Sequence, residues 1–280
     1  MINGQPSRTA HRVALHRAAH QLWDNPRVFE DPMALKIISP EDAAELAQPQ
    51  PEEPPPERYL RAFLAARSRY AEDQLAQAVA QGARQYVVLG AGLDTFACRN
   101  SFPGLRVFEV DHPATQAWKR ESLKSGGIPV PASLTFAPVD FESETLPHGL
   151  DHAGFRADEP AFFSWLGVTP YLARETVLQT LKWIISICSR NGVAFDFAVP
   201  RSSLDPTHWP GFDALAERVA AAGEPFISFF DRPELVRELR QMGFTHIEDL
   251  GSKELNVRYF SHRTDGFRTG GAGRLMCAHG

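Results

Sequence analysis

The sequence of 280 residues has little cysteine and no long hydrophobic run. Its three cysteines, Cys98, Cys188 and Cys277, lie far apart and form no C-x-x-C pair, which argues for a reducing compartment and against a structural zinc site. The N-terminus lacks the apolar stretch of a signal peptide. No apolar run approaches the roughly 18 residues of a membrane span. We therefore expect a cytoplasmic protein with no membrane partner.

Positive charge is also not in excess, because 29 Lys and Arg face 34 Asp and Glu, for a net charge of -5. Proteins that bind nucleic acid usually carry a basic excess or a clustered basic stripe, and the sequence has neither. We expect no nucleic-acid partner and favour a small-molecule substrate, with a monomer and a homodimer both open. The 43% of apolar residues, with 19 Phe and 5 Trp, exclude a disordered chain.

One proline-rich segment, residues 49–57, divides the chain. Its prolines favour an extended backbone over helix. The first block, residues 1–56, is expected to be a helical lid with its connector, whose first helix starts near Ser7 or Thr9 and ends near Trp23. A block this small buries little surface alone and should pack on the rest of the chain. The second block, residues 57–280, is the predicted ligand-binding domain.

Short apolar segments alternate with helical patterns along the second block. Such alternation is typical of an α/β fold with a doubly wound, mainly parallel sheet. The last two strands are close together in the chain, which predicts an antiparallel edge. The predicted strands are residues 85–89, 106–110, 134–139, 161–168, 192–199, 244–250 and 274–278, and the main helices are 56–80, 174–189 and 231–242.

Glycines and carboxylates stand where the first three predicted strands end. In doubly wound sheets ligands bind at the carboxyl ends of the strands. Gly90-Ala91-Gly92, followed by Asp94, lets the backbone approach a ligand closely. Asp111 follows about 20 residues later, where an acidic residue accepts hydrogen bonds from ribose hydroxyls. Asp140 can accept from an exocyclic amine and Phe141 can stack on a base, so the three ends predict a nucleoside pocket.

The identity of the nucleoside depends on Thr95, which stands where a dinucleotide fingerprint has a third Gly or Ala. A bulkier residue there fits a ligand without pyrophosphate, such as S-adenosylmethionine. A nicotinamide-dependent oxidoreductase remains an alternative, disfavoured by Thr95 and by the lack of a Tyr-x-x-x-Lys motif. An α/β hydrolase needs Gly-x-Ser-x-Gly, which the sequence lacks. A non-catalytic binding protein with the same fold is a further alternative.

Five motifs together resemble the leucine carboxyl methyltransferase family, and most closely its bacterial branch of S-adenosylmethionine-dependent O-methyltransferases. They are Arg67-Ser-Arg-Tyr, residues 88–95, 108–113 and 139–141, and Trp165-Leu-Gly-Val-Thr-Pro-Tyr-Leu172. The resemblance implies a class I methyltransferase (Rossmann-like) fold, a seven-stranded sheet with an antiparallel last strand and an N-terminal helical lid. It also implies S-adenosylmethionine as cofactor and S-adenosylhomocysteine as product. The methyl group would go to a carboxylate or hydroxyl of a small molecule, as in secondary metabolism, or to a protein C-terminus.

The resemblance also assigns the residues that bind the cofactor. Arg67 would pair with the methionine carboxylate, for which a planar guanidinium is suited. Members of the family often carry Glu where this sequence has Leu166, so the cofactor ammonium loses a possible carboxylate neighbour. The full predicted set of cofactor-binding residues is Arg67, Gly90, Ala91, Gly92, Asp94, Glu109, Asp111, Asp140, Phe141 and Trp165.

On the acceptor side, methyl transfer is an in-line displacement that requires alignment and exclusion of water, and no metal. A general base is needed only when the acceptor arrives protonated, and the sequence identifies none. Tyr171 is the candidate catalytic and substrate residue, as an orienting group or as a pocket wall. Arg17 and His20 are candidate substrate contacts on the first helix. His16 and His20 have a spacing that can bind metal, but no third ligand is evident, so we predict no metal site.

Overall fold

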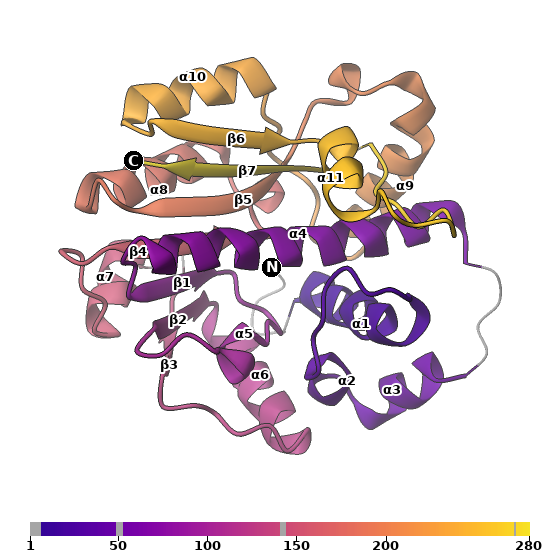
Figure 1. Ribbon diagram of the computed structural model, residues 1–280, viewed down its shortest axis with the longest axis horizontal. Helices are drawn as coiled ribbons and strands as arrows, with labels where there is room; N and C mark the ends of the chain where they lie inside the picture. The colour runs from indigo at the N-terminus through magenta and orange to yellow at the C-terminus, as the bar shows by residue number, and fades with distance from the viewer. Residues whose placement is uncertain (1–6, 49–52, 141–143, 272) are drawn as a thin grey trace.

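The computed structural model describes residues 7–48, 53–140, 144–271 and 273–280, and its centre is a seven-stranded sheet (Figure 1). The strand order is β3-β2-β1-β4-β5-β7-β6, with β7 antiparallel to both of its neighbours. This confirms the expected fold. The strands are β1 (Gln85–Leu89), β2 (Arg106–Asp111), β3 (Leu134–Pro138), β4 (Ala161–Trp165), β5 (Gly192–Ala198), β6 (His246–Leu250) and β7 (Gly273–His279).

The central strands were predictable because both faces of the sheet are covered. Every residue of β1, β4 and β5 is buried, which matches their nearly continuous apolar sequences. The predicted β3 and β5 were one residue too long, and two other predicted strands were too long by more than one residue. Strand β4 stops at Trp165, because Gly167 turns the chain with a φ of 73°. Strand β6 begins only at His246, because the amide of Phe244 still bonds to the Leu239 carbonyl at the end of the preceding helix.

Helices cover both faces of this sheet (Figure 1). One core cluster joins the strands to α4, α5 and α11, and the other joins them to α7, α8, α9 and α10. The α-helices are α1 (Arg8–Trp23), α2 (Ala34–Ile37), α3 (Pro40–Leu46), α4 (Pro55–Ala80), α5 (Phe96–Arg99), α6 (Pro113–Ser125), α7 (Leu146–His152), α8 (Arg174–Ile187), α9 (Trp209–Ala221), α10 (Arg232–Met242) and α11 (Ser252–Tyr259). A 3-10 turn, η1 (Thr169–Tyr171), follows β4, and η2 (Arg201–Ser203) and η3 (Pro206–His208) follow β5.

Helix α4 begins at Pro55, within the proline-rich segment, and runs along the sheet (Figure 1). Proline is tolerated in the first turn of a helix, because the amide that it lacks has no partner there. Its inner face buries, among others, Ala66, Tyr70 and Leu75. No helix in the described ranges is long and apolar enough to cross a membrane.

The N-terminal helices α1, α2 and α3 lie together beside the N-terminal half of α4 (Figure 1). A small apolar cluster joins them to α6 and to the loop after β1; it includes Ala14, Ala18, Ile37, Leu93 and Leu123. The block therefore rests on the sheet domain through buried contacts. Its role as a lid stays a prediction.

Candidate functional site

A cavity of about 490 Å³ opens at the carboxyl ends of the central strands, in the size range of small-ligand pockets. Helix α1 forms one wall and α4 another. The lining side chains from these helices are Thr9, Ala10, Val13, Ala14, Arg17, Arg67, Ser68, Ala71 and Glu72. Residues 88–94, 111–112, 139–140, 166–168, 171–172 and 223–225, with Ser7, Tyr86, Ser164 and Ile227, complete the lining. The cavity therefore collects residues from segments between Ser7 and Ile227 that lie far apart in the sequence.

The glycine turn after β1 brings bare backbone to the cavity. Gly90 and Gly92 have φ values of +67° and +49°, which side chains of L-residues rarely adopt. A Cβ atom at Gly90 would lie 2.2 Å from Cγ2 of Val168, and one at Gly92 would lie 3.1 Å from Cβ of Ala10. Neither position has room for a side chain without a shift of its neighbour. The predicted close approach of backbone and ligand is therefore available here.

Asp111, at the end of β2, lines the cavity and anchors the glycine turn. Its carboxylate accepts from the Gly92 amide at 2.6 Å and from the His112 amide at 2.7 Å. Burial raises the pKa of Asp111, and these two hydrogen bonds oppose the shift. Asp140 lines the cavity two residues beyond β3, while Phe141 lies outside the described residues. Asp111 and Asp140 thus line one cavity, as the predicted ribose and adenine site requires.

Arg67 projects from α4 into the cavity wall and is held by a carboxylate that the sequence did not reveal. Its Nη1 lies 2.6 Å from Oδ2 of Asp196 on β5, and the other oxygen of Asp196 accepts from the Gly167 amide at 2.6 Å. Asp196 lies beside Leu166, one position beyond the paired residues Trp165 and Phe195. A carboxylate therefore stands next to the position where the family often has Glu, but it is already paired with Arg67.

Arg17 lines the cavity, and its charge is already balanced. The guanidinium pairs with Asp31 and donates to the Thr95 hydroxyl at 2.8 Å and to the Leu93 carbonyl at 3.3 Å. Asp94 lies 3.7 Å away. Arg17 thus fastens α1 to the loop after β1, and it gives no unbalanced positive charge to attract a substrate carboxylate.

Of the predicted site residues that the structure describes, three do not line the cavity. His20 is 1% exposed; its Nδ1 bonds to Asp24 at 2.7 Å and its Nε2 accepts from the Val28 and Phe29 amides, so it has no face for substrate. Trp165 is buried in the core cluster on the α8 side, while its neighbours in the chain line the cavity.

Glu109 is the third of these residues, and it lies two residues before Asp111 on β2. At about 3.3 Å per residue it is roughly 7 Å below the strand end. There it forms a buried ion pair with Lys119 of α6, at 2.5 Å between Oε2 and Nζ. Burial raises the pKa of Glu109 to about 7, against the attraction of Lys119. The residue is thus part of the packing of α6 on the sheet.

The cavity is acidic overall. Five carboxyl groups line it, of which Glu72 is paired with Arg99 outside the lining, against two guanidinium groups that each face a carboxylate. Such a site suits a ligand with net positive charge. S-adenosylmethionine carries a sulfonium and an ammonium against one carboxylate, whereas a nicotinamide dinucleotide carries an anionic pyrophosphate. The residues present therefore fit S-adenosylmethionine; the five acidic residues are Glu72, Asp94, Asp111, Asp140 and Glu224.

Tyr171 and Glu224 also line the cavity, and they come from segments far from the glycine turn in the sequence. Glu224 accepts from the Thr9 amide at 3.0 Å and contacts the Thr9 hydroxyl through the same oxygen, Oε2. Burial raises the pKa of Tyr171 to about 12, and its hydrogen bond with Thr9 opposes the shift. Aliphatic side chains, among them Val168 and Leu172, also line the cavity. Sequence patterns could not reveal Glu224 and Thr9, which are 215 residues apart.

Comparison with known proteins gives relatives over most of the chain. YktD of Bacillus subtilis (strain 168), named as a candidate S-adenosyl-L-methionine-dependent methyltransferase, is 31% identical and covers 95% of each chain. A protein of Mycobacterium avium (strain 104) with the same description is 30% identical, over 71% of this chain and 66% of its own.

Solved structures share the fold at low sequence identity. A candidate methyltransferase from Thermobifida fusca YX has a TM-score of 0.59 and 16% identity, over 99% of this chain and 96% of its own. A DUF574 family protein from Streptomyces avermitilis has a TM-score of 0.54 and 14% identity, over 96% of this chain and 97% of its own.

The family model described as leucine carboxyl methyltransferase matches residues 10–185. This range holds the glycine turn, Asp111, Asp140, Arg67 and Tyr171, and the resemblance drawn from the sequence is confirmed. Because the family model matches more than half of the chain and the acidic cavity fits the cofactor that its relatives are named for, the chain belongs to the leucine carboxyl methyltransferase family of S-adenosylmethionine-dependent methyltransferases.

Proposed function

We propose that the protein transfers the methyl group to an oxygen of a small molecule, and that a hydroxyl is the favoured acceptor. The observation that carries this proposal is that Tyr171 and Glu224 line the same cavity as the predicted cofactor-binding strand ends. An acceptor seated against these two side chains would share one cavity with the cofactor.

When bound, S-adenosylmethionine supplies an electrophilic methyl group on a sulfonium. The chain itself aligns the two ligands. Arg67 and the turn at Gly90 and Gly92 would hold the methionine part, while Asp111 and Asp140 would hold the nucleoside. Helix α1 covers the cavity through Ala10 and Val13, which excludes water from the reacting groups.

Glu224 supports a hydroxyl acceptor over a carboxylate. A hydroxyl must lose a proton when it is methylated, and a carboxylate within reach can accept it. Glu224 would repel an anionic acceptor that lies against it. Tyr171 is a neutral phenol at neutral pH, since its pKa is about 12, and it would orient the acceptor by hydrogen bonding. The aliphatic lining supports a small organic acceptor over a polar protein C-terminus.

The experiment is transfer from methyl-labelled S-adenosylmethionine to a panel of phenols, alcohols and carboxylic acids. Mild base releases labelled methanol from methyl esters and leaves methyl ethers intact, so it separates the two acceptor classes. We expect base-stable products. Glu224→Gln should lose most of the transfer while it retains S-adenosylhomocysteine binding, and Glu217→Gln, an exposed position on α9, should behave as the unchanged protein. Base-labile products, or full activity in Glu224→Gln, would overturn the hydroxyl assignment.

A further inference from the structure

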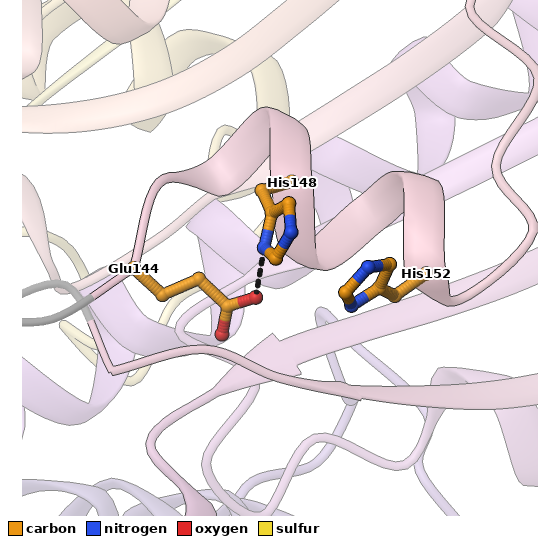
Figure 2. A group of neighbouring side chains, drawn as sticks. All are labelled: Glu144, His148 and His152. Atoms are coloured by element: carbon orange, nitrogen blue, oxygen red, sulfur yellow. Dashed lines mark hydrogen bonds and ion pairs between the residues drawn. The ribbon is translucent and has the colours of Figure 1, made fainter.

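A cluster of metal-binding side chains lies at α7, apart from the residues that line the cavity. Glu144, His148 and His152 each offer one ligand atom, and these atoms all lie within 4.8 Å of one another (Figure 2). Figure 2 shows the carboxylate and the two imidazoles along one side of the helix. The sequence interpretation considered only His16 and His20 as a histidine pair and so overlooked this set.

The spacing of the three residues explains why they meet. His148 and His152 are four residues apart in α7, and positions i and i+4 share one face of a helix. Glu144 precedes the helix by two residues and continues the same interval. Its Oε1 lies 2.7 Å from Nδ1 of His148, and the rings of His148 and His152 have centroids 4.0 Å apart. Each of the three side chains is therefore in contact with at least one of the other two.

The donor set selects the kind of ion. Two imidazoles and one carboxylate form a ligand set that zinc uses in proteins, with one or more positions left to water. Mg²⁺ and Ca²⁺ prefer oxygen ligands. Zinc bonds of about 2.0–2.2 Å put neighbouring donors roughly 3.4 Å apart in a tetrahedral site. Both histidines are exposed and Glu144 is half-buried, so small side-chain rotations can close the present spacing.

The backbone around the cluster is held in place on both sides. The Glu144 amide donates to the Asp140 carbonyl at 2.7 Å. Gly149 packs so closely that a Cβ atom there would lie 2.3 Å from Cγ2 of Val139. Since the segment is anchored to the end of β3, the three side chains are presented from a fixed frame, which lowers the entropy lost on metal binding.

We propose that Glu144, His148 and His152 form a binding site for a divalent transition metal of the zinc type. An ion here would link residue 144 to the last turn of α7. It would lie outside the methyl-transfer cavity, which none of the three residues lines. The site is independent of the proposed acceptor chemistry.

The test is isothermal titration of the full chain, free of any histidine tag, with ZnCl₂ and separately with MgCl₂. We expect one saturable zinc site, no magnesium binding and a higher melting temperature with zinc, since an ion that binds only the folded state stabilises it. His148→Ala and His152→Ala should each raise the zinc Kd at least tenfold, and Glu144→Gln should raise it less. His262→Ala is the matched control, because His262 is exposed and lies far from the cluster in the sequence.

Circular dichroism of each variant shows that it is folded before its zinc affinity is compared. Zinc binding that is unchanged in the His148→Ala and His152→Ala variants would place the ion elsewhere and refute the proposal. The absence of saturable zinc binding to the unsubstituted protein would refute it equally.

Discussion

Substitution of Asp111 by Asn tests the assignment of the nucleoside site. The carboxylate already accepts from the Gly92 and His112 amides, and in the complex it would also accept from the ribose hydroxyls. Asn offers a single acceptor oxygen, and its NH₂ group must face either a backbone amide or a ribose hydroxyl. The variant therefore loses at least one charge-assisted hydrogen bond to the cofactor, which is worth about 1.5–3 kcal/mol.

A loss of this size corresponds to a roughly tenfold to hundredfold higher Kd. The assay is titration calorimetry with S-adenosylhomocysteine, combined with a thermal melt to show that the variant is folded. Asp158→Asn removes the same charge at an exposed position and should leave the Kd unchanged. If folded Asp111→Asn protein bound S-adenosylhomocysteine as tightly as the unsubstituted protein, the ribose role of Asp111 would be wrong.

Three further predictions follow from the buried charges and the glycine turn. Arg67→Ala should raise the Kd for S-adenosylhomocysteine about tenfold, or 1.4 kcal/mol. Arg17→Ala should mainly lower the melting temperature, because buried Asp31 loses an ion-pair partner at a cost of about 3 kcal/mol. A larger rise of the Kd in Arg17→Ala than in Arg67→Ala, measured by calorimetry, would mean that the two roles are exchanged. Glu109→Gln should change cofactor affinity less than twofold. Because the folded protein holds the Glu109 proton more tightly than the unfolded chain does, protonation of Glu109 contributes to the free energy of unfolding. This contribution is fully present below the ordinary pKa of 4.5 and is lost as the pH rises through about 7. Thermal melts from pH 4 to 8 should therefore show a weaker pH dependence in Glu109→Gln, and an identical profile would contradict this. Gly90→Ala should destabilise the protein by roughly 1–3 kcal/mol, since the positive φ and the contact with Val168 both oppose a side chain; unaltered urea unfolding would count against the strain.

The residues at the strand ends could be predicted from the sequence, because their positions follow from local patterns. A parallel sheet brings the carboxyl ends of its strands to one edge, so Gly90, Asp111 and Asp140 had to meet once β1, β2 and β3 were recognised. The seven strands and the antiparallel β7 also agreed with expectation. The N-terminal block packs against α4 as its small size required.

The remaining features depend on contacts that no local pattern encodes. His20 is fixed by Asp24 and by two amides of the following loop, and these contacts, rather than its place on α1, decide its role. Glu109 shares a strand with Asp111, but its depth in the sheet pairs it with Lys119. Glu224 meets Thr9 across most of the chain. Such long-range pairs became visible only in the structure.

The most direct test of the central claim is a crystal structure of the protein with S-adenosylhomocysteine. We predict that the adenosine lies against Asp140 and Asp111, that the homocysteine carboxylate lies beside Arg67, and that the thioether sulfur points toward Tyr171 and Glu224. A product molecule bound outside this cavity, or one whose sulfur points away from Tyr171 and Glu224, would contradict the assignment of the cavity as the methyl-transfer site.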